Sequence, residues 1–183
     1  MQNNPRDLIK DIYKGNSRAM GILLSHSEAV AQKAMEIARS VPQFEPDIRF
    51  IEESALLHDI GMLMTNAPAL GCHGDLPYIC HGVEGRKILE ARGLPAHALV
   101  CERHVGLGLT VDDISANKFP LPERDMLPLS VEERIVCFAD KFFSKLGDTR
   151  EKSISKVRAS IARYGHDKSR EFDSMLAQFF QNI

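Results

Sequence analysis

The tetrapeptide His58-Asp59-Ile60-Gly61 decides how this sequence is interpreted. It closes an expected helix over 46–59, in which His58 lies at helical spacing from Ile51 on the apolar face. The glycine then stops the helix. Neighbours on a helix point about 100° apart, but the last side chain of a helix can swing. The histidine and the aspartate can therefore both reach one metal ion, or the carboxylate can bridge two.

Outward from this stretch, most of the chain has the period of apolar helices. Further helices are expected over 25–40, 81–92, 95–104, from the capping box at Ser130 to about 146, 153–164 and 168–180. Two segments rich in glycine and proline, 62–79 and 106–128, are expected to be long loops, the second with a short helical turn near Asp112. No segment shows the alternation typical of a strand. The sequence therefore predicts an all-α fold.

The composition is that of one ordinary globular domain spanning 1–183. The chain is 44% hydrophobic and 26% charged. Its formal net charge of -2 leaves no basic excess, so nucleic acid is not an expected partner. The four cysteines form no CxxC pair, and residues 1–14 contain no apolar leader. No apolar run is long enough to cross a bilayer, so we expect a cytoplasmic protein that binds no membrane.

Five polar side chains fall on the apolar faces of different expected helices: His26, His58, His81, His104 and Asp140. One inward histidine is commonly a hydrogen-bonded core residue, but burying a carboxylate without a partner is costly. A shared divalent cation would explain all five, because imidazole and carboxylate are its usual ligands. The spacing alone thus predicts a metal centre inside a helical bundle.

These positions also carry a resemblance to a known family. With His26 upstream and Asp140 in Phe138-Ala139-Asp140-Lys141 downstream, the order H…HD…D resembles the HD superfamily of metal-dependent phosphohydrolases. The pattern spans a motif core of 26–140, and 151–181 follows as C-terminal helices. The resemblance implies an HD-domain helical bundle in a single domain. His81 and His104 look like the additional pair of dinuclear members.

The resemblance implies two metal sites that share one carboxylate. The first metal would be held by His26, His58, Asp59 and Asp140. Asp59 would bridge to a second metal, which would be held by His81 and His104. Nitrogen and oxygen ligands suit two divalent transition-metal ions, Fe, Mn, Co, Ni or Zn, with Mg as a further candidate.

Two departures from the family pattern narrow the resemblance. Met62 stands where many members have a lysine after HDIG, which removes one candidate phosphate-binding cation. Val105 follows His104 in place of a second histidine, and no GYP sequence occurs. The second departure argues against the branch that hydrolyses cyclic di-GMP.

Four side chains near the ligands are candidates for binding substrate: Lys141, Arg86, Arg103 and His73. Lys141 is also a candidate catalytic residue beside Asp59, because lysine is a common phosphate binder. For the two arginines the alternative is an ordinary surface cation. For His73 the alternative is a loop residue without a role in the site.

The expected activity is hydrolysis of a nucleotide or another small phosphate ester by a metal-activated water. Two alternatives stay open: an HD-fold di-iron oxygenase, or a catalytically silent, metal-bound nucleotide sensor. The expected partner is the small-molecule phosphate ester or nucleotide itself. The two amphipathic C-terminal helices are expected either to close the bundle or to pair with another copy in a homodimer, through the apolar residues Phe172, Leu176, Phe179 and Phe180.

Overall fold

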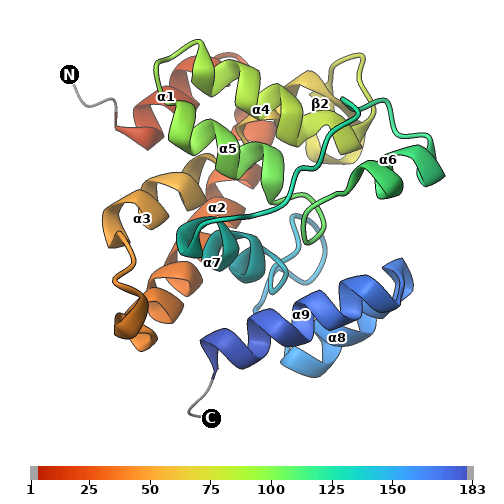
Figure 1. Cartoon of the computed structure of the whole chain (residues 1–183). Helices are drawn as coiled ribbons and strands as arrows, with labels where there is room; N and C mark the ends of the chain where they lie inside the picture. The colour runs from red at the N-terminus through yellow and green to blue at the C-terminus, as the bar shows by residue number, and fades with distance from the viewer. Residues whose placement is uncertain (1–3, 181–183) are drawn as a thin grey trace.

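The computed structural model describes residues 4–180, which fold almost entirely into helices (Figure 1). The helices are α1 (Pro5–Ile12), α2 (Ser17–Ser40), α3 (Ile48–Leu57), α4 (His81–Glu90), α5 (Pro95–Arg103), α6 (Val111–Asn117), α7 (Val131–Asp140), α8 (Ile154–Ile161) and α9 (His166–Phe179). Short 3-10 turns link several of them. The expected all-α fold is confirmed.

Two apolar clusters meet along the long helix α2, against which α3 and α7 pack (Figure 1). The larger cluster joins α2, α3, α7 and α9, and includes Val30. The second joins α1, the first half of α2 and the α4–α5 pair, and includes Leu23. His26 therefore lies on α2 at the point where one cluster gives way to the other. The boundary between the clusters leaves room for polar groups inside the bundle.

Capping side chains fix where the helices of the site begin. The side chain of Asn16 accepts a first-turn backbone N–H, so α2 begins at 17 rather than at the expected 25. Asp47 and Ser130 cap α3 and α7 in the same way. Because α3 leads to His58 and α7 ends on Asp140, these caps also set the height of both ligands in the bundle.

The structure corrects three expectations about the elements. Helix α1 was not among the expected helices. Helix α7 ends at Asp140 rather than near 146, because the next three backbone amides bond to carbonyls three residues back and tighten the turn. The first long loop contains a small antiparallel sheet, β1 (Asn66–Ala67) paired with β2 (Cys72–His73). Strands of two residues are too short to show any alternation in the sequence. The short helical turn expected near Asp112 is present as α6.

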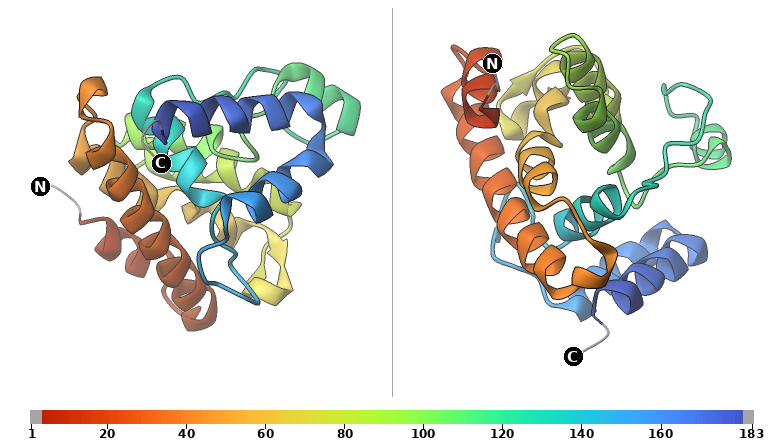
Figure 2. Two further views of the ribbon diagram at one scale, coloured as in Figure 1. Left: turned by 90° about the horizontal axis from the view of Figure 1, so that it is seen from below. Right: turned by 60° about the vertical axis from the view of Figure 1, so that its left-hand side comes forward.

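The C-terminal helices α8 and α9 lie beside each other and pack against α7 (Figures 1 and 2). Phe172 and Phe179 are buried in the larger cluster, and Leu176 and Phe180 pack partly buried against it. Of the two alternatives for these apolar residues, closing the bundle or pairing with another copy, the structure shows the first. The last residue of the expected segment 151–181 lies outside the described residues.

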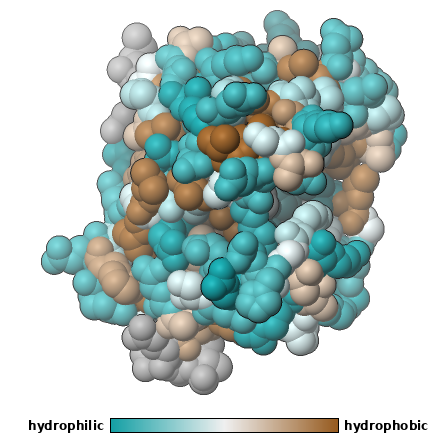
Figure 3. Space-filling view, turned by 45° about the vertical axis from the view of Figure 1, so that its right-hand side comes forward, coloured by the Kyte–Doolittle hydropathy of each residue, from teal (hydrophilic) through white to brown (hydrophobic). Residues whose placement is uncertain are grey.

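The face drawn in Figure 3 is mainly hydrophilic, with apolar residues in small separate spots. Large apolar side chains that are exposed are few, with Leu129 and Tyr164 the most exposed. Within residues 4–180, no helix has both the length and the apolar character of a bilayer span.

Candidate metal centre

Four buried side chains from three helices converge inside the bundle. His26 comes from the middle of α2, His58 and Asp59 from the end of α3, and Asp140 from the end of α7. His26 Nε2 lies 3.0 Å from Asp140 Oδ1 and 3.3 Å from Asp59 Oδ2. His58 Nε2 lies 3.0 Å from the same Asp59 oxygen. We call these residues the four-ligand group.

Two further histidines approach Asp59 from its other side. His81 is the first residue of α4, and His104 directly follows α5. Their Nε2 atoms lie 3.3 and 3.4 Å from Asp59 Oδ1 and 3.2 Å from each other. We call His81 and His104 the two-histidine group. Asp59 thus directs one carboxylate oxygen toward each group.

Backbone carbonyls orient three of the four imidazole rings. The Nδ1 atoms of His58, His81 and His104 each lie 2.7 Å from the carbonyl three residues earlier, that of Ala55, Tyr78 or Cys101. A neutral imidazole has a single N–H, which here donates a hydrogen bond to this carbonyl. In the neutral ring, Nε2 then carries an unprotonated lone pair that faces the centre, as in metal-bound histidines.

The donor atoms fit a divalent cation better than they fit one another. Two bare Nε2 atoms 3.2 Å apart, in His81 and His104, cannot bond to each other. Within residues 4–180, His58 Nε2 and both Asp59 oxygens are buried without an aligned hydrogen bond, although the Lys145 ammonium lies 2.7 Å from Asp59 Oδ2. Unpaired buried polar atoms are costly, and imidazole and carboxylate are metal ligands. The residues present therefore fit bound divalent metal.

The two carboxylates of the four-ligand group are balanced by His58 and by two adjacent lysines. Burial works against ionised Asp59, but His58 and Lys145 outweigh it and hold the carboxyl pKa well below its usual range. Burial likewise opposes ionised Asp140, and Lys141 and the nearby histidines lower its pKa as well. Burial also disfavours protonated His58, yet the two carboxylates raise its pKa to about 9. Without metal, this group holds a proton between its carboxylates.

The two-histidine group behaves in the opposite way. Burial lowers the pKa of His81 to about 3, and only part of that effect is offset by Asp59. Burial also lowers the pKa of His104. Both rings are therefore neutral near pH 7 and have their lone pairs free for a metal.

Gly61 allows α4 to approach the Asp59 turn. This turn continues as the 3-10 segment η2 (Ile60–Met64), which packs directly on α4. A Cβ atom at Gly61 would lie 2.2 Å from both the amide nitrogen of Gly85 and the carbonyl oxygen of His81. Only a residue without Cβ fits there, so the glycine of the tetrapeptide serves the second ligand group by letting His81 reach Asp59.

A tyrosine from outside the motif fixes the same turn. The buried hydroxyl of Tyr13 donates to the carbonyl of Ile60 at 3.1 Å and accepts from the amide of Leu63 at 3.2 Å. Burial raises the pKa of Tyr13 above its usual value, so the hydroxyl keeps its proton. Sequence reasoning missed this residue, because nothing in the spacing links it to residues so far downstream.

A cavity of about 680 Å³ opens beside the two-histidine group. His81, His104 and Asp140 form part of its lining, together with four lysines, of which Lys141, Lys145 and Lys152 come from the segment that follows α7 and Lys168 comes from α9. Its other walls come from the 105–109 segment, α6, and the α8–α9 pair. The ligand groups therefore face a space lined by cations near the metal ligands.

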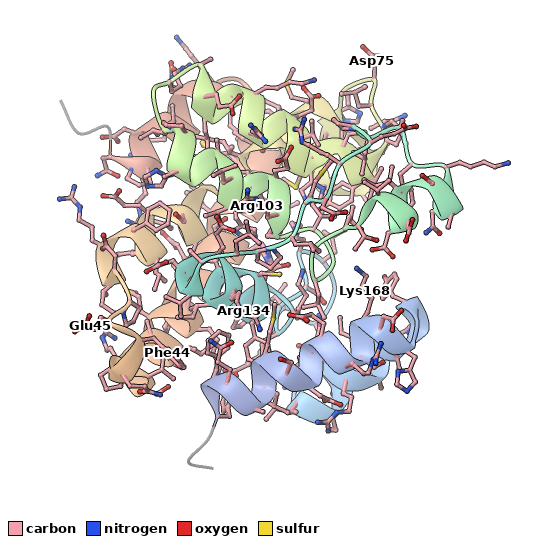
Figure 4. The ribbon with its side chains drawn as sticks, viewed as in Figure 1. Phe44, Glu45, Asp75, Arg103, Arg134 and Lys168 are labelled. Carbon is pink, nitrogen blue, oxygen red and sulfur yellow. The ribbon has the colours of Figure 1, made fainter. Side chains whose placement is uncertain are left out.

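The C-terminal pair is tied across this cavity to α6. Figure 4 shows Lys168 reaching up from α9, and its Nζ donates to Asp113 and to the carbonyl of Gly108, each at 2.7 Å. Hydrogen bonding to Lys168 and Thr110 offsets the burial of Asp113 and lowers its pKa. This ion pair fixes α9 as a wall of the cavity.

Of the four expected substrate contacts, the structure places only Lys141 in the cavity. Arg86 is held by Glu90 and Glu102, and Arg103 donates to both carboxylate oxygens of Glu133, across from α5 to α7 (Figure 4). His73 is exposed in β2. These three side chains do not line the cavity, so we do not carry them into the proposed site. Arg103 points away from the metal centre, whereas its neighbour His104 points into it, because adjacent helical residues point about 100° apart.

Lys145 and Tyr78 are among the cavity residues that sequence reasoning missed. Lys145 lies four residues after Lys141, a spacing that would have indicated a shared face. The ring of Tyr78 stacks on His81 with centroids 4.6 Å apart and lies 5.9 Å from Lys145 Nζ. Burial works against the Lys145 ammonium, but Asp59 and Asp140 outweigh it and raise its pKa.

Sequence comparison finds relatives of two kinds. The family model described as HD domain matches residues 23–144. An uncharacterized protein of Methanocaldococcus jannaschii is 37% identical over 154 residues, covering 77% of this chain and 82% of that protein. The tRNA (cytidine(56)-2'-O)-methyltransferase of Picrophilus torridus is 33% identical over 130 residues, 70% of this chain but 33% of that protein. The Thermoplasma volcanium enzyme of the same name is 29% identical over 90% of this chain and 44% of that protein. This chain thus spans less than half of either methyltransferase.

A solved structure has the same fold. The HD domain of the phosphodiesterase PgpH from L. monocytogenes superposes with a TM-score of 0.58 over 93% of this chain and 87% of that chain, at 16% identity. The likeness supports the expected HD-domain bundle. Because the family model covers more than half of the sequence, the chain belongs to the HD domain family.

Proposed function

We propose that the protein is a metal-dependent hydrolase of phosphate esters with two metal sites. One observation carries the proposal: Asp59 directs one oxygen to each ligand group, and three lysines of the segment 141–152 line the cavity beside them. A carboxylate shared by two groups of donors is suited to bridging two cations. Lysines beside such a pair suit an anionic substrate.

The side chains have separable tasks in this proposal. When bound, the two cations would supply a nucleophilic water and neutralise charge on the phosphoryl oxygens. His26, His58 and Asp140 would hold one cation, and His81 and His104 the other, with Asp59 between them. Lys141 is itself positioned, since its Nζ donates to Asp140 at 2.6 Å and to the carbonyl of His104 at 3.1 Å. Its charge would orient a phosphate at the open side of the centre.

The proposed substrate is a nucleotide or another small phosphate ester. The cavity combines the lysines near the ligands with apolar and aromatic walls that include Leu109, Phe119 and Ile161. An anionic head with a flat or apolar organic group would satisfy both parts of the lining. The volume of about 680 Å³ is in the range of ligand pockets for small molecules.

The test is elemental analysis of the purified protein, followed by a panel of phosphate esters with Mn, Fe, Co, Ni or Mg added. We expect two ions per chain and turnover of at least one ester. A fully loaded protein that hydrolyses no member of the panel would contradict the proposal. In that case a mixed-valent iron signal in electron paramagnetic resonance would favour an oxygenase, and tight nucleotide binding without turnover would favour a sensor.

A further inference from the structure

Lys145 enters the metal centre from a segment that follows α7. The segment 141–153 has no regular secondary structure. From it, the side chain of Lys145 extends so that Nζ lies 2.7 Å from Asp59 Oδ2, the oxygen that faces the four-ligand group. The side chain is 16% exposed and lines the cavity, so it connects the buried carboxylate to the substrate space.

The other two cavity lysines of the segment 141–152 are held by backbone carbonyls, whereas Lys145 is not. Lys141 donates to the carbonyl of His104, and Lys152 donates to the carbonyl of Phe143 at 3.1 Å. Within residues 4–180, Lys145 Nζ makes no hydrogen bond to a carbonyl, and its one close ion pair is with Asp59. Lys145 is therefore the lysine of these three that no backbone carbonyl holds in place, so its position depends on the Asp59 carboxylate.

Asp59, the partner of Lys145, is also the carboxylate that bound cations would share. With both Asp59 oxygens committed to cations, the ammonium would lose its partner and face like charges only a few ångströms away. The flexible stem of lysine would let Nζ move into the adjoining cavity, where a phosphoryl group could replace the carboxylate. Tyr78, whose ring lies 5.9 Å from Nζ, borders that path.

No cation comes to the cavity from the segment directly after the tetrapeptide. Met62 is fully buried in the apolar cluster with Leu57 and Ile60. The lysines near the metal ligands come instead from residues 141–152. The lysines available to a substrate phosphate thus come from the chain segment after Asp140, and not from the segment after Asp59.

We propose that Lys145 is a catalytic residue, whose ammonium leaves Asp59 when metal binds and contacts the phosphoryl group of the substrate. The inference rests on the proposed function, because it requires a phosphate beside the metal centre. It differs from the role of Lys141, which stays bound to Asp140. Lys145 would exchange one anionic partner for another.

The first test measures binding of inorganic phosphate to the Mn-loaded full chain by titration calorimetry. Lys145→Met should keep its metal content and weaken the phosphate Kd by about 10-fold or more, because one charge-assisted hydrogen bond is lost. Lys145→Arg should recover part of the affinity. The matched control is Lys156→Met, since Lys156 is exposed on α8 outside the cavity lining, and it should bind phosphate like the original chain.

Two results would overturn the inference. A phosphate Kd within about twofold of the original would show that Lys145 does not contact the phosphate. A loss of bound Mn in Lys145→Met, with helical circular dichroism intact, would show that the lysine builds the centre instead. Once an ester is found, kcat/KM of Lys145→Met should fall by about 10²-fold at unchanged metal content. If no ester is hydrolysed, the proposed function fails, while phosphate binding still decides the role of Lys145.

Discussion

The two ligand groups use the same kinds of side chain, but their charges are balanced differently. In the four-ligand group, two carboxylates face two imidazoles, and the pKa of His58 is raised to about 9. In the two-histidine group, the rings share one carboxylate with the other group, and burial lowers the pKa of His81 to about 3. The first group can therefore close around a proton when no metal is present. The second has two facing lone pairs that only a cation can join.

This difference indicates how the two sites should bind metal. Carboxylates supply most of the charge attraction for a divalent ion, and the four-ligand group has one of its own in Asp140. The two-histidine group has only its share of Asp59. We therefore expect the two-histidine site to be the weaker one and the first to empty on dialysis.

The largest effect should come from Asp59→Ala, which breaks both groups at once. We expect loss of both ions and a fall in ester hydrolysis of at least about 10³-fold, more than the loss of one donor usually costs. Elemental analysis and kcat/KM measure the two effects. The control Asp112→Ala removes an exposed carboxylate on α6 and should change neither. A variant that keeps two ions and full activity would remove Asp59 from the bridging role.

His104→Ala should separate the two groups. We expect the metal content to fall from two ions to one per chain, since only the two-histidine site loses a donor. Activity should fall by about 10²-fold, less than for the shared carboxylate. Anomalous scattering from Mn-soaked crystals would show which site keeps its ion. If the content stays at two ions per chain, His104 does not hold the second ion; if both the original chain and the variant bind one ion, the centre is mononuclear.

Gly61→Ala should act on the two-histidine group through the backbone. Its Cβ would meet Gly85 and the carbonyl of His81 at 2.2 Å, so α4 must shift. We expect a loss of stability of about 1–3 kcal/mol and weaker metal binding at the second site by about 10-fold. The matched control is Gly21→Ala in the second turn of α2, where the added Cβ meets nothing within 4 Å and should stabilise by up to about 1 kcal/mol. Equal effects of the two substitutions on metal content would contradict this role of Gly61.

The smallest effect should be a change of stability with pH in the metal-free protein. The raised pKa of His58 means that its contribution is complete below about 6.5, the ordinary value, and is lost as the pH rises to about 9. The lowered pKa values of His81 and His104 work the other way, and their contribution is lost as the pH falls below about 6.5. Denaturation midpoints of chelator-treated protein should therefore peak near pH 6.5.

The variants His58→Asn and His81→Asn test this assignment separately. The first should flatten the alkaline side of the profile and the second the acid side. Loading with metal should also flatten the alkaline side, because a bound cation keeps His58 neutral. An alkaline side that persists unchanged in His58→Asn would show that another group titrates there.

Five of the six candidate ligands were predictable because each of them breaks a periodic pattern, and the sixth, Asp59, was predictable because it adjoins His58 at a helix end. His26 and Asp140 stand at inward positions of amphipathic helices, where polar residues are unexpected, and the structure brings them to one point. The all-α fold followed from the same periodicity and is confirmed. The role of each ligand in binding metal stays a prediction.

The rest could not be predicted, because it depends on contacts between distant segments. The hydroxyl of Tyr13 meets a backbone turn far downstream, and no local pattern records such a contact. Arg103 was favoured because it adjoins a ligand, but the helical turn between neighbours directs it to Glu133 instead. The strands of the small sheet are fixed by the turn at Gly71, and two residues carry no periodic signal.

Tyr13 and Lys145 both fall outside the stretch 23–144 over which the family model matches. A shortened chain cut to those limits would keep all six donor side chains. It would lose the Tyr13 hydroxyl, which is hydrogen-bonded to the turn after Asp59, and the Lys145 ammonium, which pairs with the Asp59 carboxylate. The working unit is thus longer at both ends than the segment by which the family is recognised. An alignment of relatives over that segment alone would omit positions 13 and 145, at which the relatives could differ.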